Sequence, residues 1–304
     1  MKKHTEDLKM NRIKPVTNFL FNLLFVILAL CAILPVVFVF IISISSEESI
    51  RQVGYSFLPV ELSSKAYLFL WNERETIFNA LLVSVTVTCI GTLLGLTLTT
   101  TMGYALSRPG FKLKKFYTWV IFIPMLFSGG LVACYVVNAN ILGLRNTIWA
   151  LILPLAVSSY NIVICKTFFK STVPDGIIES AKIDGASQLR TFISIVLPIS
   201  KPLLATISLF LCFGYWNDWF LSSLYISDSK LISLQALLNN IMRSLEYMAN
   251  NPSAGVSLQQ YKAQMPGESV RMAIAIVIVI PIACAYPFFQ KYFISGLTIG
   301  AVKG

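Results

Sequence analysis

Long apolar runs, separated by short polar segments, follow one another along most of this chain. A helix that crosses a lipid bilayer needs roughly 20 apolar residues, and six stretches meet that requirement: 17–44, 77–106, 116–138, 147–169, 201–226 and 271–294. The pattern predicts an all-α polytopic membrane protein with six transmembrane helices, in which an N-terminal helix, 17–44, precedes a core bundle over 77–294. The first run is too long for a secretory signal peptide, so we expect it to remain as a helix.

One segment between two apolar runs has a different periodicity. Within 228–270, apolar side chains recur at helical spacing, at Leu231, Leu234, Leu238, Ile241, Leu245 and Met248. This spacing predicts an amphipathic helix on the outer surface, which either packs over the bundle or contacts an external partner. No repeat or low-complexity tract occurs, so residues 1–304 are expected to form a single transmembrane domain.

Composition agrees with a membrane protein, and charge gives its orientation. Hydrophobic residues make up 56% of the chain and charged residues only 12%, which is too few to cover a soluble surface. Sixteen of the 24 Lys and Arg residues fall in the N-terminal, 107–115, 166–201 and C-terminal segments. Because basic residues accumulate on the cytoplasmic side, both termini and these segments are expected there, with 45–76 and 228–270 outside. The positive net charge then requires no nucleic acid partner.

Residues for catalysis or metal binding are scarce. The only histidine is His4, and the six cysteines lie in or beside apolar runs without CxxC spacing, so neither histidine catalysis nor a metal site is expected. No Gly-Lys dipeptide occurs, which excludes a Walker A phosphate loop. Acidic residues are nearly absent from the apolar runs, apart from Asp218, which argues against a proton- or sodium-coupled carrier. The sequence therefore predicts no enzyme activity and no cofactor on this chain.

A polar and aromatic segment, FGYWNDWF at 213–220, interrupts the run 201–226. It could line a translocation path, because aromatic rings stack on sugar faces while Asn and Asp accept hydrogen bonds from hydroxyl groups. It could equally be an interfacial aromatic belt, in which Asp218 caps a helix or forms a pair near the headgroups. The candidate path residues are Tyr215, Trp216, Asn217, Asp218 and Trp219.

Two further features of the apolar runs favour packing over binding. Asn161, midway along 147–169, could reach a substrate, but a hydrogen bond to a neighbouring helix is the simpler interpretation. Gly91 and Gly95 form a GxxxG pattern in 77–106. Small residues at this spacing let two helices approach closely.

The most informative passage is ESAKIDGASQLRTFISIVLP, at 179–198, where charged residues and a glycine separate two apolar runs. Pro174 and Asp175 suit the start of a helix, and Asp184-Gly185 supplies a turn that tolerates positive φ. A second helix follows until Pro198 disturbs it. The passage is predicted to form a compact helical elbow outside the bilayer, with Gly185 at a turn where a side chain would clash.

This passage resembles the EAA loop of permease subunits from binding-protein-dependent ABC importers. That loop reads E-A-A, three residues, G, nine residues, then I-x-L-P, and the chain departs from it only in Ser180, a small residue in place of alanine. Other segments are similar to the maltose-type carbohydrate branch: GYALSR at 103–108, 167–187, YWNDWF and the tail 290–304. Residues 127–154 are similar to the sub-branch associated with complex oligosaccharides and polysaccharides.

The resemblance implies a division of labour between subunits. The chain would lie among the lipids of a prokaryotic cytoplasmic membrane, pair with a second, homologous permease, and rest on two cytoplasmic ATPase subunits that bind ATP and Mg. An extracytoplasmic sugar-binding protein would deliver the solute. The coupling loop, 170–200, would dock in an ATPase cleft and transmit ATP-driven closure to the bundle. The residues implied in coupling are Glu179, Ser180, Ala181, Asp184, Gly185, Ala186, Ile195, Leu197 and Pro198, with Gly185 allowing the turn and Ala181 close approach.

The expected function is therefore that of the transmembrane subunit of an ATP-driven carbohydrate importer, which moves an oligosaccharide by alternating access. Two alternatives remain. One is a permease of the same superfamily for a non-sugar solute such as an amino acid. The other is a membrane scaffold or sensor that transports nothing.

Overall fold

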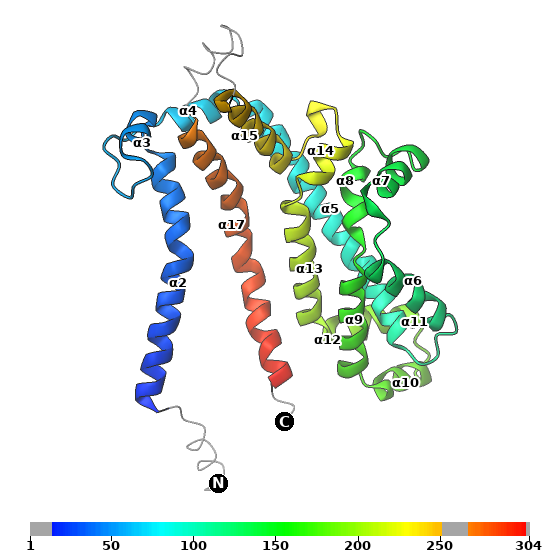
Figure 1. Ribbon diagram of the computed structural model, residues 1–304. Coiled ribbons are helices and arrows are strands. Elements are labelled where there is room, and N and C mark those ends of the chain that lie inside the picture. The colour runs from blue at the N-terminus through cyan, green and yellow to red at the C-terminus, as the bar shows by residue number, and fades with distance from the viewer. Residues whose placement is uncertain (1–13, 251–266, 302–304) are drawn as a thin grey trace. The chain divides into compact units, whose positions relative to one another are not determined.

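The chain folds as an assembly of helices (Figure 1), in a computed structural model that describes residues 14–250 and 267–301. Within these residues, the regular structure is helical, apart from an isolated antiparallel bridge between Ser45 and Leu62. The all-α fold predicted from the apolar pattern is therefore confirmed for the described part of the chain. The helices group into two compact units, which are described separately.

The first unit consists, among the described residues, of 14–71 and 267–277. The side chain of Glu47 ties its two segments together, because one carboxylate oxygen accepts hydrogen bonds from the backbone N–H (2.8 Å) and the hydroxyl (2.9 Å) of Ser269. The carboxylate thus satisfies a donor at the beginning of a helix, where backbone N–H groups lack intrahelical partners. The helices of this unit are α2 (Pro15–Ser43), α3 (Glu47–Val53), α4 (Lys65–Asn72) and the first turns of α17 (Glu268–Ala301).

The second unit, described over 72–250 and 278–301, contains the segments singled out in the sequence. Its longest continuous helix is α5 (Arg74–Ser107), which packs against α8, α9 and α13 (Figure 1). The other elements are α6 (Lys114–Leu126), α7 (Gly130–Tyr135), η1 (Val136–Ile141), α8 (Trp149–Ala156), α9 (Ser159–Thr172), α10 (Asp175–Ile183), α11 (Gln188–Thr191), η2 (Phe192–Val196), α12 (Leu197–Ile199), α13 (Lys201–Trp216), α14 (Phe220–Tyr225), η3 (Ser229–Leu231), α15 (Leu234–Asn250) and the rest of α17.

The GxxxG pattern of α5 is a packing surface, as predicted. A Cβ atom added at Gly91 would overlap the ring of Tyr215 on α13. At Gly95 a Cβ would lie 2.7 Å from the carbonyl oxygen of Ala156, at the end of α8. Both glycines therefore allow a neighbouring helix to approach more closely than any side chain on α5 would permit.

The apolar runs are less regular as helices than the sequence indicates. By length and composition, α2 and α5 could each cross a membrane, and the number rises to four if each of two bent helix pairs is one span. The helices α8 and α9 meet at 47°, while 188–199 meets α13 at 85°. The expected run 116–138 is divided among α6, α7 and η1, with Gly130 at a φ of +79° in the break. Six spans thus remain a prediction.

The predicted amphipathic segment is helical where the structure describes it. The helix α15 begins with the apolar side chains of Leu234, Ala236 and Leu238 buried in the second unit. The N–H of Leu234 donates to the hydroxyl of Ser84 on α5 at 2.8 Å, which anchors the start of the helix. Packing over the other helices, the first of the two roles expected for this segment, is therefore observed at its beginning.

Candidate functional site

The elbow, defined here as residues 174–200, begins with a short helix whose ends are set by local chemistry. Pro174 precedes α10 in an extended conformation, and its ring fixes a backbone angle compatible with a helix start. Asp175 lies in the first turn and Lys182 in the last, so each charge is placed favourably for the helix dipole. The helix predicted from this passage is confirmed, with a start at Asp175.

The turn after α10 has the hydrogen bonds of a Schellman motif. The N–H of Ala186 donates to the carbonyl of Ala181 at 2.9 Å, and the N–H of Gly185 donates to the carbonyl of Lys182 at 3.1 Å. Gly185 has a φ of +77°, as its position between the two arms predicts. The expected steric clash is wrong, however, because a Cβ at Gly185 would meet no atom within 4 Å. The backbone conformation, rather than space, favours glycine here.

The second arm starts at another cap and ends near Pro198. The hydroxyl of Ser187 accepts a hydrogen bond from the N–H of Arg190 at 3.2 Å, which satisfies a donor in the first turn of α11. The second arm continues through η2 and α12, and its helical segment ends at Ile199. Pro198 lies within α12, and the helical segment continues one residue past it, to Ile199, before the turn at Ser200.

The residues implied in coupling include both buried and exposed side chains of this elbow. Ala181 is buried and only 6% exposed, so the close approach expected there is made within the chain itself. Two apolar side chains that sequence reasoning missed are on the outside, Ile183 at 86% and Leu189 at 67% exposure. Of the other residues implied in coupling, Ala186, Ile195 and Leu197 are half-buried, and the exposed ones are Glu179, Ser180, Asp184, Gly185 and Pro198.

An arginine from the end of α5 holds the start of the elbow. One terminal nitrogen of Arg108 forms an ion pair with Asp175, with 2.9 Å between Nη1 and Oδ1, and the other donates to the carbonyl of Phe169 at 2.8 Å. Its Nε donates to the hydroxyl of Ser107 at 2.9 Å. The Arg108 side chain is only 13% exposed. The guanidinium therefore connects the ends of α5 and α9 to the first residue of α10.

Aromatic rings pack beside this arginine. The ring of Tyr104 lies 4.9 Å from that of Phe192 and 5.8 Å from that of Phe169, measured between centroids. The guanidinium of Arg108 lies 5.3 Å from the centroid of Tyr104, within the range of a cation–π contact. The three rings come from α5, α9 and η2, so the elbow is joined to the helices by both apolar and polar contacts.

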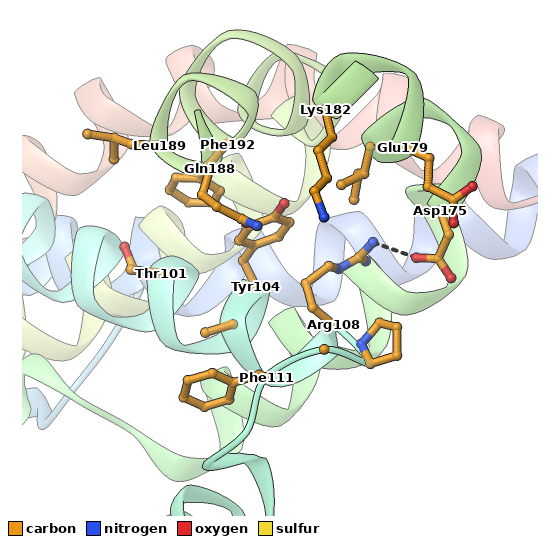
Figure 2. A pocket seen from close by; sticks show the side chains of 14 residues that line it. Thr101, Tyr104, Arg108, Phe111, Asp175, Glu179, Lys182, Gln188, Leu189 and Phe192 are labelled. Atoms are coloured by element: carbon orange, nitrogen blue, oxygen red, sulfur yellow. Dashed lines mark hydrogen bonds and ion pairs between the residues drawn. The ribbon is translucent and has the colours of Figure 1, made fainter. Parts of the chain in front are cut away.

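A cavity of about 710 Å³ lies between the elbow and the end of α5 (Figure 2). Arg108 and Lys182 extend into this space from opposite sides, and the dashed line in the figure marks the ion pair of Arg108 with Asp175. Tyr104 and Phe192 form its apolar floor. The cavity therefore separates α10 from the end of α5, and the ion pair of Asp175 with Arg108 is a polar contact at its edge.

The FGYWNDWF segment forms a break between α13 and α14. The hydroxyl of Tyr215 donates to the carbonyl of Ile152 at 2.7 Å, and Asp218 accepts a hydrogen bond from the N–H of Leu221 at 3.2 Å, near the start of α14. Tyr215 and Asp218 therefore have structural partners within the chain, and for Asp218 this is the helix-capping role that the alternative interpretation predicted.

The remaining side chains of the candidate path differ in exposure. Trp216 is buried, with its Nε1 lacking a hydrogen-bond partner among the described residues. Asn217 is exposed and donates to the carbonyl of Phe213 at 3.0 Å. Trp219 is 38% exposed, with Arg243 above its ring. Asn161 is buried in α9, away from solvent. Of these residues, Trp219 has the most accessible aromatic face.

Sequence reasoning did not identify Arg108 as part of this site. The segments GYALSR and RPGFKLKK were noticed for their family resemblance and their charge, but the partners of Arg108 lie 61 and 67 positions further along the chain. The available signal was an arginine directly after a long apolar helix, where it can bind the carbonyls of helix ends. Among the described residues, no group of three His, Cys, Asp or Glu side chains could hold a metal ion.

Comparison with known proteins gives the family context. The family model described as "Binding-protein-dependent transport system inner membrane component" matches residues 91–299. The polygalacturonan/rhamnogalacturonan transport system permease protein YtcP of Bacillus subtilis (strain 168) is 36% identical over 294 residues, which cover 97% of this chain and 99% of YtcP. Protein LplC of the same organism is 37% identical over 90% of each chain.

A solved structure has a similar fold. The crystal structure of a bacterial ABC transporter involved in the import of the acidic polysaccharide alginate contains a chain that superimposes with a TM-score of 0.78 at 27% sequence identity. The similarity covers 91% of this chain and 96% of the transporter chain.

Proposed function

The chain belongs to the family of binding-protein-dependent transport system inner membrane components, and on that premise we propose that it is the transmembrane subunit of an ATP-driven importer for oligosaccharides. As a permease of the bacterial inner membrane it carries no ATPase activity of its own. The observation that carries the substrate class is the similarity to YtcP, which extends over nearly the full length of both chains. Fragments of acidic polysaccharides are the first candidates, since the alginate importer shares the fold.

The proposed complex contains four further parts. A second permease would complete the path, two ATPase subunits would bind ATP and Mg on the cytoplasmic side, and a binding protein would deliver the sugar from outside. Both termini and the elbow are placed on the cytoplasmic side, as the distribution of Lys and Arg favours. Switching between inward- and outward-facing states would be a rigid-body movement of packed helices.

Within this complex, the elbow is the proposed contact with an ATPase subunit. Ile183 and Leu189 expose apolar side chains on a polar segment, and exposed apolar groups of this kind are typical of interaction sites. Glu179 of α10 is also exposed and could pair with a basic residue of the partner. Ala181 and Gly185 contribute to the shape of the elbow, which is set by the Schellman turn.

The FGYWNDWF segment is proposed to border the solute path through its accessible members. Trp219 can stack on a sugar face, and Asn217 can exchange hydrogen bonds with hydroxyl groups. Tyr215 and Asp218 support this surface from behind, because each already has a partner within the chain. Trp216 and Asn161 are buried, so any contribution that they make to the path is through the packing of α13 and α9.

Uptake into vesicles tests the proposed function. The chain is reconstituted with its partner permease, ATPase subunits and binding protein, and labelled galacturonate oligomers are offered with and without ATP on the ATPase side. We expect ATP-dependent accumulation that unlabelled acidic oligomers compete away. Accumulation of amino acids instead would establish the non-sugar alternative, and an assembled complex without ATP-dependent uptake of either solute class would overturn the assignment as an importer.

A further inference from the structure

Arg108 holds the ends of three helices that meet where the elbow begins. It follows the last residue of α5, its Nη2 binds a carbonyl in the last turn of α9, and its Nη1 binds the first residue of α10. A second ion pair among the described residues, between Arg271 and Glu268, joins residues only three positions apart. A single planar group therefore fixes the start of the elbow relative to the two helices behind it.

We propose that Arg108 is the positioning residue that carries a movement of the elbow into α5. The inference rests on the proposed coupling role of the elbow and names the connection through which the elbow would act. Movement of α10 displaces Asp175, and the ion pair transmits that displacement to Arg108 at the end of α5. Because α5 packs against α8, α9 and α13, a shift of its end is passed to the helices of the unit.

The chemistry at this position requires arginine. The guanidinium uses separate nitrogens for Asp175, for the carbonyl of Phe169 and for the hydroxyl of Ser107. A lysine carries the same charge, but its ammonium is a compact point charge that cannot reproduce this planar fork. Hydrogen bonds between charged groups are stronger than neutral ones. In the ion pair of Arg108 with Asp175, the arginine side chain is largely shielded from water.

The cavity explains why the polar contact matters for transmission. A space of about 710 Å³ lies between α10 and the end of α5, whereas Phe192 and Val196 of the second arm pack in the core with Tyr104. The second arm is therefore joined to the helices by apolar packing. At the start of α10, the ion pair of Asp175 with Arg108 supplies a contact of defined distance and direction.

The first test compares charge removal at two neighbouring basic residues. Arg108→Gln removes the fork, and the matched control Lys112→Gln removes a charge from the exposed loop just beyond it. In the reconstituted complex, Arg108→Gln should lower the ratio of binding-protein-stimulated to unstimulated ATP hydrolysis by about fivefold or more, the lower end of usual coupling between sites. Lys112→Gln should retain the wild-type ratio. Subunit content and thermal unfolding are measured on the same samples.

A second measurement separates transmission from mere stabilisation of the fold. In a background without native cysteines, spin labels are placed at Ile193 in the elbow and at Phe78 near the first turn of α5, both exposed. With the wild-type arginine, a non-hydrolysable ATP analogue should change the spectra of both labels. With Arg108→Gln, the elbow label should still respond and the α5 label should not. Arg108→Lys should give a smaller response at α5 than arginine does.

Asp175→Asn provides an independent variant if Arg108→Gln assembles poorly. It should lower the same ratio. Added to Arg108→Gln in complexes that assemble, it should cause little further loss, because each change alone already removes the ion pair. The inference is overturned if the variants that assemble show a wild-type ratio with both labels responding, or if Lys112→Gln causes the same loss. An elbow label that ignores ATP in the wild-type complex would instead refute the coupling role of the elbow itself.

Discussion

The turn at Gly185 offers a sharp test of how the elbow works. Its φ of +77° lies in the left-handed region, and a Cβ there would meet no atom of this chain within 4 Å. A substitution therefore acts through backbone strain alone, unless a partner subunit covers the site. For an L-residue the left-handed conformation costs about 1–2 kcal/mol, while asparagine adopts it more readily than other residues. The series Gly185→Asn, Gly185→Ala and Gly185→Val should therefore be increasingly harmful.

The size of the effect follows from that strain. A cost of about 1–2 kcal/mol shifts the equilibrium of the formed turn by roughly 5- to 30-fold. The hydrogen bonds from Gly185 to Lys182 and from Ala186 to Ala181 are the ones that this shift would open. We therefore expect Gly185→Ala to raise hydrogen exchange of these amides by that factor, with Gly185→Val above it and Gly185→Asn close to wild type.

Hydrogen exchange of the purified complex, with transport measured in parallel, would check this series. Gly214→Ala is the control for hydrogen exchange and thermal unfolding, because Gly214 lies in α13, has open space around it and shows no positive φ. If all three Gly185 variants abolish transport equally while their amides exchange as in wild type, backbone strain is not the reason for glycine. A partner surface pressed against the turn would then be the cause, and the clash would be between subunits.

Two further predictions concern packing and orientation. Gly103→Val should destabilise the second unit by about 1–3 kcal/mol, typical of overpacking, because a Cβ at Gly103 would overlap Cys165; a Gly103→Val protein that unfolds thermally like the Gly214→Ala control would contradict this packing. A cysteine at Ser187, in a background without native cysteines, should resist impermeant thiol reagents in intact cells and react after permeabilisation. Labelling in intact cells would reverse the proposed orientation.

The elbow could be predicted from sequence because its signals are local. The extended Pro174, the dipole-matched charges of Asp175 and Lys182, and the glycine at the turn all act within a few residues of their own position. Caps and turns of this kind depend on hydrogen bonds between near neighbours along the chain. Of the two reasons predicted for Gly185, the positive φ is confirmed, but the clash within the chain is not. The space around a residue depends on parts of the chain that local patterns do not describe.

The helices themselves were less predictable, and for a related reason. Apolar composition reports the surroundings of a segment but not whether it is straight. The run 147–169 bends at Val157. The run 201–226 breaks after Trp216 and resumes as α14 at Phe220, where Asp218 accepts a hydrogen bond from the N–H of Leu221. The roles of Tyr215 and Arg108 depended on partners more than 60 positions away. Such contacts are properties of the folded chain and leave little trace in its periodicity.

The helix α5, which would receive a movement of the elbow, is tightly packed against its neighbours. Gly91 and Gly95 bring α13 and the end of α8 directly against its backbone, and Gly103 does the same for α9. Interiors packed this closely transmit strain because they leave no free space to absorb it. A displacement at the elbow end of α5 must therefore move α9 and α13 with it, or open contacts that the glycines have made tight. The first outcome is the rigid-body movement that transport requires, and the close contacts at these three glycines favour it over the second.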